Sequence, residues 1–298
     1  DFCARVRGNM VNKRVVEALI KAGAFDALNP SRERLLASLE LAFRHADLLE
    51  ANEHQGGLFD FDDTPTPEPD LLDAPAWGVR ERLSLEKSAI GFYLSGHLFD
   101  EHAAEVRRLV PTPLVDQGDT RRESVLLAGI VNDLRVISGA RGRTCIFKLD
   151  DGSASLEFSL GGEQYDGLKD LLQEDQLVFV QGTVSHDRFS DGLRGRVGTV
   201  FDLAGARSRL AKALQIELPR PTRQQVAQLR EWVRRHPAQT ISGDDGETLE
   251  RGLAVRWPLR LGGAEAELDL GPEARHWPSS EALAELARLG LPARVVYR

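Results

Sequence analysis

Apolar and polar residues alternate in five short runs between residues 125 and 203, a pattern typical of β-strands with one buried face. Turn residues separate the runs, and a stretch of helical spacing interrupts them once. The predicted strands cover residues 125–137, 143–150, 154–160, 176–186 and 193–203, and the helix covers residues 163–172. Three strands, a helix and two strands are the element order of an OB barrel. We therefore predict a closed five-stranded barrel in residues 119–203.

The pattern before the barrel is helical. Val15, Leu19 and Ala22 share one face of a predicted helix, which Gly23 is expected to end. A second helix is predicted to open at Pro30, and its apolar stripe consists of Leu35, Leu39, Ala42, Ala46 and Leu49. We therefore predict a helical packing unit in residues 1–50 and a helical connector in residues 74–118.

Residues 204–298, after the barrel, follow the order β, α, β, β, α, β. The predicted strands cover residues 214–218, 253–261, 264–270 and 293–297, and residues 243–246 are predicted to be a loop. Thr222 with Gln225 offers a capping box for the first helix, and Ser279 or Ser280 caps the second. This order predicts a small ferredoxin-like tail domain. Trp232, Trp257 and Trp277 would be contact anchors if exposed, although Trp usually belongs to the core.

The composition changes sharply between the first helices and the connector. Residues 50–73 contain eight acidic residues, three prolines and no Lys or Arg, which predicts a flexible linker in residues 51–73. The linker contains Gln55, Leu58 and Phe59 in the sequence Gln-Gly-Gly-Leu-Phe. Leu and Phe can fill a partner's pocket while the Gln amide bonds at its rim, so we interpret these residues as a docking motif. The alternative is that Leu58 and Phe59 fold back onto the neighbouring helices.

The net charge of −8 argues against a broad nucleic-acid or membrane coat. Residues 119–203 contain ten Lys or Arg and fourteen Asp or Glu, so any DNA contact of the barrel must be local. The cations gather in two hairpins: Arg135, Arg141, Arg143 and Lys148 in the first, and His186, Arg188, Arg194 and Arg196 in the last. Phe189 at the second hairpin tip could stack on bases. Phe147 and Phe158 could also stack, but their alternation favours the core.

Two further groups of residues resemble catalytic sites, but their sequence context argues against catalysis. Asp60, Asp62 and Asp63 resemble a metal-binding carboxylate set of a hydrolase, but they lie in the linker without a rigid scaffold. Ser95 and His97 share one turn, which does not position a nucleophile and its base.

Composition adds three expectations. The two cysteines, Cys3 and Cys145, are expected to be reduced, buried thiols rather than a disulfide or metal set. No apolar run approaches the ~20 residues of a membrane span, so no membrane contact is expected. The chain opens within ordered-looking sequence, as expected of a piece of a longer chain.

Four segments together resemble the carboxyl-terminal part of the alpha subunit of bacterial replicative DNA polymerase III: residues 11–28, 55–59, 86–100 and 125–137. The resemblance implies a helix-hairpin-helix remainder, a clamp-binding segment, an OB domain and a tail domain, in that order. It implies that Gln55, Leu58 and Phe59 bind the sliding clamp, that the barrel faces single-stranded template, and that residues 204–298 bind the tau subunit of the clamp loader. It also implies a role in DNA replication. The cytoplasmic location that we expect follows from the two reduced cysteines.

The chain departs from this family at Gly56-Gly57, a flexible spacer in the docking motif, and at Leu98, where the family usually has proline. The residues that resemble this family do not include the metal-binding carboxylates of its polymerase domain, so the resemblance assigns no catalytic residue here. We therefore expect no catalytic residue, metal or cofactor in this chain, with magnesium expected only in the polymerase domain of the parent nucleotidyltransferase. The alternative function is an independent single-stranded nucleic-acid-binding protein.

Overall fold

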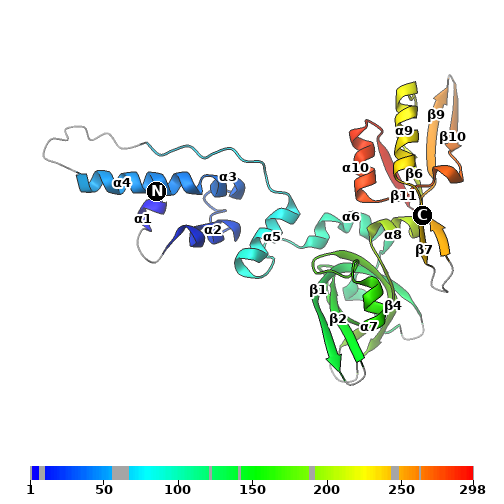
Figure 1. Ribbon diagram of the computed structural model, residues 1–298, viewed down its shortest axis with the longest axis horizontal. Helices are drawn as coiled ribbons and strands as arrows, with labels where there is room; N and C mark the ends of the chain where they lie inside the picture. Colours follow the sequence, from blue (N-terminus) through cyan, green and yellow to red (C-terminus); the bar gives the residue numbers. More distant parts are fainter. Residues whose placement is uncertain are drawn as a thin grey trace. The chain divides into compact units, whose positions relative to one another are not determined.

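The structure, a computed structural model, divides into two compact units, Asp1–Glu101 and His102–Arg298, which we call the amino-terminal and carboxyl-terminal units (Figure 1). None of its described helices is long and apolar enough to span a membrane. The described residues are 2–6, 11–55, 67–120, 123–139, 142–187, 192–242, 248–261 and 263–297.

The described part of the amino-terminal unit is helical. Its elements are α1 (Phe2–Arg5), α2 (Lys13–Lys21), α3 (Arg32–Ala37), α4 (Leu39–Gln55), α5 (Val79–Ile90) and the 3₁₀ helix η1 (Leu98–Glu101). Asn12 caps α2 by accepting the Val15 N–H. Beyond α2 the chain turns at Gly23, whose φ of 82° lies in the left-handed region that glycine adopts without strain. The helix stop predicted at Gly23 is confirmed.

The buried face of α2 differs from the prediction. Val16 is 2% exposed and Ile20 is 4% exposed, whereas Val15 is 41% exposed. The predicted face is therefore wrong by one position. Five of the six residues 15–20 are apolar, so spacing alone did not decide which arc of the helix meets its neighbours.

The second predicted helix divides at Ser38 into α3 and α4. The Ser38 N–H ends α3 by bonding the Arg34 carbonyl, and its hydroxyl accepts the Leu72 N–H at 2.8 Å. The apolar stripe continues through this break, since Leu39 and Ala46 are both buried. The predicted apolar stripe is therefore buried, although the predicted single helix is two helices.

Arg32, 6% exposed, joins α3 to α5. It donates to Asp26 at 2.6 Å and to Glu86, a fully buried residue of α5, also at 2.6 Å. Glu86 additionally accepts the N–H groups of Leu94 and Ser95. Burial alone would raise the pKa of Glu86, but the hydrogen bonds from Ser95, Arg32 and Leu94 outweigh it and lower the pKa to about 2.

The carboxyl-terminal unit contains the predicted barrel. Its strands close in the order β1-β2-β3-β5-β4, with β3 parallel to β5 and the other neighbours antiparallel. This is an OB-like barrel, as the order of elements predicted. The elements are β1 (Val125–Gly139), β2 (Gly142–Asp150), β3 (Ser155–Gly161), α7 (Gly162–Leu168), β4 (Leu177–His186) and β5 (Leu193–Phe201).

Alternation along the strands places large side chains inside the barrel. Phe147 of β2 and Phe158 of β3 are fully buried, and their rings stack with centroids 5.6 Å apart. They are therefore core residues, and the alternative that they stack on bases is excluded. Cys145 is also fully buried, and burial raises the pKa of its thiol to about 11.

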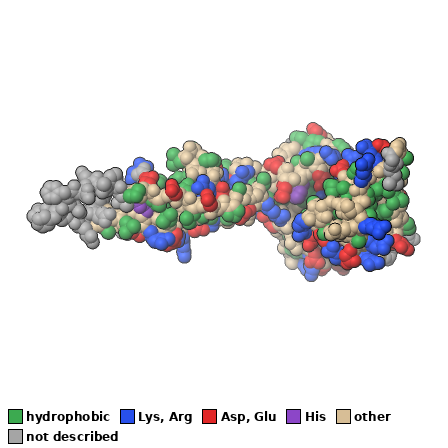
Figure 2. Space-filling model, turned by 90° about the horizontal axis from the view of Figure 1, so that it is seen from above, with side chains coloured by type: hydrophobic (Ala, Val, Ile, Leu, Met, Phe, Trp, Pro, Cys, Tyr) green, Lys and Arg blue, Asp and Glu red, His purple; other side chains and the backbone are tan. Residues whose placement is uncertain are grey.

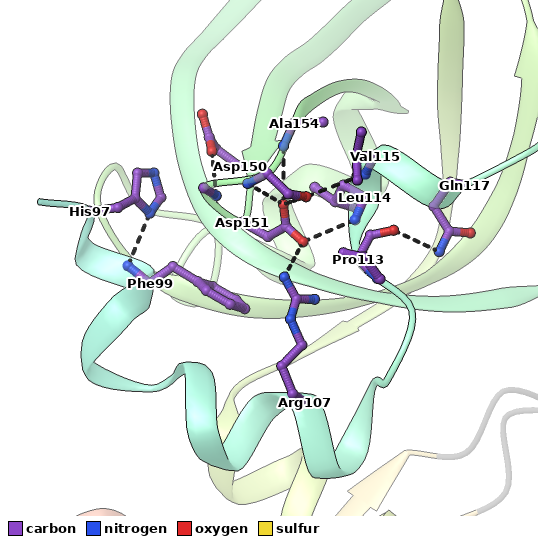
Figure 3. A network of polar contacts seen from close by, with 12 residues as sticks. His97, Phe99, Arg107, Pro113, Leu114, Val115, Gln117, Asp150, Asp151 and Ala154 are labelled. Carbon is purple, nitrogen blue, oxygen red and sulfur yellow. Dashed lines mark hydrogen bonds and ion pairs between the residues drawn. The ribbon is translucent and has the colours of Figure 1, made fainter.

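A helical connector precedes the barrel in the same unit. It consists of α6 (Ala103–Leu109) and the 3₁₀ helix η2 (Leu114–Asp116). Figure 3 shows Arg107 of α6 reaching Asp151, which lies in the turn between β2 and β3. The Leu114 N–H donates to the same carboxylate at 2.9 Å. One buried acid therefore fastens both parts of the connector to the barrel.

The tail contains a four-stranded sheet in the order β10-β9-β6-β11. The predicted order of elements is present, with an additional helix α8 before β6 and an additional hairpin of β7 and β8. The predicted loop at residues 243–246 lies outside the described residues. The elements are α8 (Leu203–Leu210), β6 (Ala211–Ile216), α9 (Arg223–Arg235), β7 (Gln239–Ser242), β8 (Thr248–Arg251), β9 (Val255–Leu261), β10 (Ala264–Asp269), η3 (Pro272–Ala274), α10 (Ser280–Arg288) and β11 (Ala293–Tyr297).

The strand order of the tail differs from a ferredoxin-like domain. In that split arrangement another strand separates the two parallel strands, whereas β6 and β9 are direct parallel neighbours here. The β9–β10 hairpin therefore extends the sheet outward instead of inserting β10 beside β6. The order of elements along the chain is common to both arrangements, so the sequence pattern did not separate them.

Two of the three tail tryptophans are buried in the core of the tail. Trp232 is fully buried and donates to the Ala282 carbonyl at 2.9 Å, and Trp257, 3% exposed, donates to the Leu218 carbonyl at 2.6 Å. Both are therefore core residues rather than contact anchors. Trp277 is only partly buried. The capping box of Thr222 with Gln225 is confirmed, and Ser279 caps α10.

Candidate nucleic-acid interface

The outer face of the barrel is built from alternate residues of four strands. Residues 145, 147 and 149 of β2 and 156, 158 and 160 of β3 point into the core, so the residues between them point outward. We call this surface the outer face. It consists of Arg135 and Ile137 of β1, Thr144, Ile146 and Lys148 of β2, Glu157 and Ser159 of β3, and Arg194 and Arg196 of β5.

Strand register arranges the outer face in two cross-strand rows. The first row runs Lys148, Glu157, Arg194 across β2, β3 and β5. The second row runs Arg135, Ile146, Ser159, Arg196 from β1 across to β5. Four of the cations that the sequence singled out therefore lie on one surface, although they are up to about sixty positions apart in the chain.

Carboxylates neutralise most of these cations. Glu157 accepts from Arg135 at 3.1 Å through one oxygen and from Arg194 at 2.6 Å through the other. Lys148 lies 2.7 Å from Asp133. Arg196 is exposed and has no ion-pair partner within the part of the chain that the structure describes. The cations of the outer face are thus aligned in two rows, but nearby carboxylates neutralise all of them except Arg196.

A β-bulge positions the partner of Lys148. Asp133 has a φ of 53° at the irregularity between Asn132 and Arg135. The N–H groups of Asp133 and Leu134 donate to the Glu174 carboxylate at 3.0 and 3.1 Å. The bulge therefore turns Asp133 out of the regular ladder, where its side chain meets Lys148.

The other predicted contacts are placed differently. In the alternation along β2, Arg143 falls on the same side as the inward residues Cys145, Phe147 and Leu149. It pairs with Asp166 of α7, at one end of the barrel. Arg141, Arg188 and Phe189 lie outside the described residues, as do Leu58 and Phe59 of the docking motif. Gln55 is the last residue of α4.

The described outer face carries no aromatic side chain. Its apolar members are Ile137, 48% exposed, and the partly buried Ile146. Phosphate contact by the arginines is therefore the chemistry that this surface offers directly, with base stacking left to residues outside it. Figure 2 shows basic and acidic side chains interspersed over the visible face of the carboxyl-terminal unit.

Sequence reasoning missed Glu157 and Asp133 as members of this surface. A signal for Glu157 was available, since it alternates with the inward residues Leu156 and Phe158. Its two arginine partners lie on different strands, however, and only the barrel register brings them together.

The structure describes one of the two other chemical groupings, Ser95 with His97. His97 accepts the Phe99 N–H through Nδ1, and the Ser95 N–H donates to Glu86, so both residues serve the local turn. Asp60, Asp62 and Asp63 lie outside the described residues. Within the described ranges, no three His, Cys, Asp or Glu side chains gather as a metal site would require.

Comparison with known proteins gives consistent relatives. The family described as a helix-hairpin-helix motif matches residues 1–35. The DNA polymerase III subunit alpha of Neisseria meningitidis serogroup B is 42% identical over 220 residues, which cover 73% of this chain and 19% of that protein. The subunit from Vibrio cholerae is 34% identical over 310 residues, covering 97% of this chain and 25% of its own length. The Escherichia coli K12 subunit is 36% identical over 226 residues, which cover 73% of this chain and 19% of that protein.

Solved structures resemble the chain only in part. A mitochondrial single-stranded DNA-binding protein from S. cerevisiae, Rim1, covers 29% of this chain and 96% of its own, with 14% identity and a TM-score of 0.24. A likeness of this size carries no functional argument. The relation to the alpha subunits rests on sequence, and the chain spans about a fifth to a quarter of their length. The chain belongs to the family of DNA polymerase III alpha subunits.

Proposed function

We propose that this chain is a noncatalytic processivity and assembly region of a DNA polymerase III alpha subunit, and that its barrel holds single-stranded template. The observation that carries the barrel's role is the pair of cross-strand rows that gather Arg135, Lys148, Arg194 and Arg196 on one surface. Strands 2 and 3 form the face that OB barrels commonly use for oligonucleotides. The sequence relation to alpha subunits supports a role in DNA replication.

The expected contact is local and weak. Arginine pairs well with phosphate because its planar guanidinium presents two parallel donors. Each phosphate contact to single-stranded DNA releases condensed counterions and adds roughly 0.7 to the slope of log affinity against log salt. A few arginines on an acidic chain therefore predict modest affinity that falls as salt rises.

Fluorescence anisotropy of the chain with labelled oligothymidylate tests this role. An oligonucleotide of about 16 nucleotides matches the upper end of the site size of one OB fold. We expect the double variant Arg194→Gln/Arg196→Gln to bind several-fold more weakly with a shallower salt slope. Arg256→Gln/Arg260→Gln, which removes two arginines of β9 in the tail sheet, serves as the matched control and should bind like the natural chain. Equal affinity of all three would refute the barrel as the binding surface.

We further propose that Gln55, Leu58 and Phe59 bind the sliding clamp. A tether to a ring on DNA makes each re-engagement of a polymerase intramolecular and raises its effective concentration. Calorimetric titration with a bacterial sliding clamp should show binding that disappears in Leu58→Ala/Phe59→Ala. Leu48→Ala is the control, because Leu48 is an apolar side chain of α4 that is 58% exposed. Loss of binding in the control as well would argue against this assignment.

The tail, residues 204–298, is proposed to bind the tau subunit of the clamp loader. The support is the resemblance to the alpha subunits together with the position of the tail after the barrel. Titration of the whole chain with tau should give a saturable complex, and no heat or mobility change would refute it.

Nucleotidyl transfer is proposed to belong to the polymerase domain of the parent protein, with magnesium bound there. In this reading the present chain has no cofactor of its own and acts in the cytoplasm by tethering.

A further inference from the structure

We propose that Glu157 is a built-in competitor for the phosphates of single-stranded nucleic acid, and that it sets how weakly the outer face holds a strand. This inference rests on the proposed DNA contact of the barrel and names the residue that limits it.

The position of Glu157 is central on the outer face. It lies on β3, between Lys148 of β2 and Arg194 of β5 in the first cross-strand row. Arg135 reaches it from β1, so cations from three strands surround one carboxylate. Glu157 is only 22% exposed at its side chain, whereas Arg135 and Arg194 are 57% and 48% exposed. The acid thus lies beneath the two arginines that solvent and ligands meet.

The geometry of the carboxylate is that of a bridging anion. One oxygen of Glu157 accepts from Arg135 Nη2 and the other from Arg194 Nη2. A backbone phosphate, which also presents several acceptor oxygens, would bridge the same two guanidinium groups. A phosphate held there would lie beside the Glu157 carboxylate, and two like charges at that separation repel. Binding of a strand must therefore share or break the bonds that Glu157 already makes.

A purely structural role does not account for this arrangement. Ion pairs between partly exposed side chains contribute roughly 0–1 kcal/mol to folding, so the barrel does not need Glu157 for stability. Hydrophobic residues fill the core beneath it, including the stacked Phe147 and Phe158. Cancelling the charge of two arginines is the larger effect of the residue.

The consequence for a moving polymerase is fast exchange. A strand that slides over the barrel must release each phosphate, and affinity differences of this kind fall mainly on the dissociation rate. A resident carboxylate that replaces a departing phosphate lowers the affinity without removing the arginines that position the strand. The outer face can then guide template without trapping it.

The experiment compares the whole natural chain with three variants by anisotropy with labelled oligothymidylate of about 16 nucleotides over a salt series. Glu157→Gln removes the competing charge and keeps the side-chain size. Glu265→Gln is the matched control, because Glu265 pairs with Arg260 at 2.8 Å on the tail sheet and its replacement changes the net charge equally. A third chain combines Glu157→Gln with Arg135→Gln and Arg194→Gln.

Glu157→Gln should bind the oligonucleotide on the order of tenfold more tightly, with a steeper salt slope, because Arg135 loses its carboxylate partner and Arg194 keeps only the more distant Asp187, 3.8 Å away. Glu265→Gln should bind like the natural chain, and the triple variant should lose the gain. A gain equal in Glu157→Gln and Glu265→Gln, or one that survives in the triple variant, would overturn the inference while leaving DNA binding intact. No binding by any chain would overturn both the inference and the proposed function.

Discussion

Arg107 of α6 donates a hydrogen bond of 2.6 Å to Asp151, whose side chain is fully buried in the turn between β2 and β3. The Asp151 carboxylate also accepts from the Leu114 N–H and from the N–H and hydroxyl of Ser153. Burial alone would raise the pKa of Asp151, but the hydrogen bonds from Ser153, Arg107 and Leu114 outweigh it and lower the pKa to about 2. A single anion thus holds connector and barrel together.

Asp151→Asn should destabilise the carboxyl-terminal unit by about 3 kcal/mol, because it removes the buried negative charge that accepts from Arg107, Leu114 and Ser153 and replaces one acceptor oxygen by a donor. Urea unfolding followed by circular dichroism measures the loss. Asp150→Asn is the control at the neighbouring position, where the carboxylate is partly exposed and accepts the Gly152 N–H. A cost in the control as large as in Asp151→Asn would contradict a special role for the buried acid.

Gly195 allows β5 to approach β3 closely enough to close the barrel. It pairs with Phe158, and a side chain at this position would overlap the Phe158 ring. Gly195→Ala should therefore destabilise the barrel by roughly 1–3 kcal/mol through overpacking. Gly161→Ala, at the end of β3 where nothing lies within 4 Å of the added carbon, should cost less. Equal thermal stability of Gly195→Ala and the natural chain would show that the barrel relaxes around the added methyl group.

The barrel was predictable because its information is local. Alternation along each strand marks the inward face, and turn residues mark the strand ends, so residues such as Phe147 and Phe158 were assigned to the core correctly. Helix α8 was missed for the opposite reason. In its sequence, Leu-Ala-Gly-Ala-Arg-Ser-Arg-Leu, small apolar residues come first and polar residues 207–209 follow as a block, so the two kinds do not recur at helical spacing.

Pairing between distant segments could not be predicted from the sequence. The parallel contact of β6 with β9 depends on how the β9–β10 hairpin joins the sheet, and the order of elements permits either arrangement. The candidate site shows the same division. The positions of Arg135 and Arg194 on strands were predicted, whereas their shared bond to Glu157 follows only from barrel closure.

Glu105 should be needed to keep the tail attached to the barrel connector. Arg207 of α8, 5% exposed, donates two bonds to Glu105 of α6 at 2.6 and 2.8 Å and one to the Pro278 carbonyl at 3.0 Å. The Tyr297 hydroxyl at the end of β11 also donates to Glu105. Glu105→Ala leaves a buried guanidinium without its anion and should cost about 3–5 kcal/mol.

Tyr297→Phe removes only one hydrogen bond of this cluster and should cost about 1 kcal/mol. Limited proteolysis measures how firmly the tail is held. Loosening of the tail should expose new cleavage sites in Glu105→Ala but few in Tyr297→Phe. Similar digestion patterns for Glu105→Ala and the natural chain would mean that the tail packs without this ion pair.

His276 should make the tail sensitive to mild acid. It is fully buried, its ring lies 4.8 Å from that of Trp232, and neither ring nitrogen has a hydrogen-bond partner among the described residues. The pKa of His276 is lowered from 6.5 to about 4, mainly because burial disfavours the charged imidazolium; the Leu253 backbone acts in the opposite direction, and nearby His236 also lowers it. The folded tail therefore keeps this imidazole neutral at pH values where the unfolded chain binds a proton.

The sign of the pH dependence follows from this depressed pKa. The contribution of neutral His276 to stability is fully present above about pH 6.5 and is lost as the pH falls toward about 4, by roughly 3 kcal/mol in total. Trp fluorescence during urea unfolding reports mainly on the tail, which holds Trp232, Trp257 and Trp277 of the four tryptophans. His276→Leu should flatten the loss of stability in this window, whereas His186→Gln, at an exposed residue of β4, should not. An unchanged acid loss in His276→Leu would assign the window to other titratable groups of the tail.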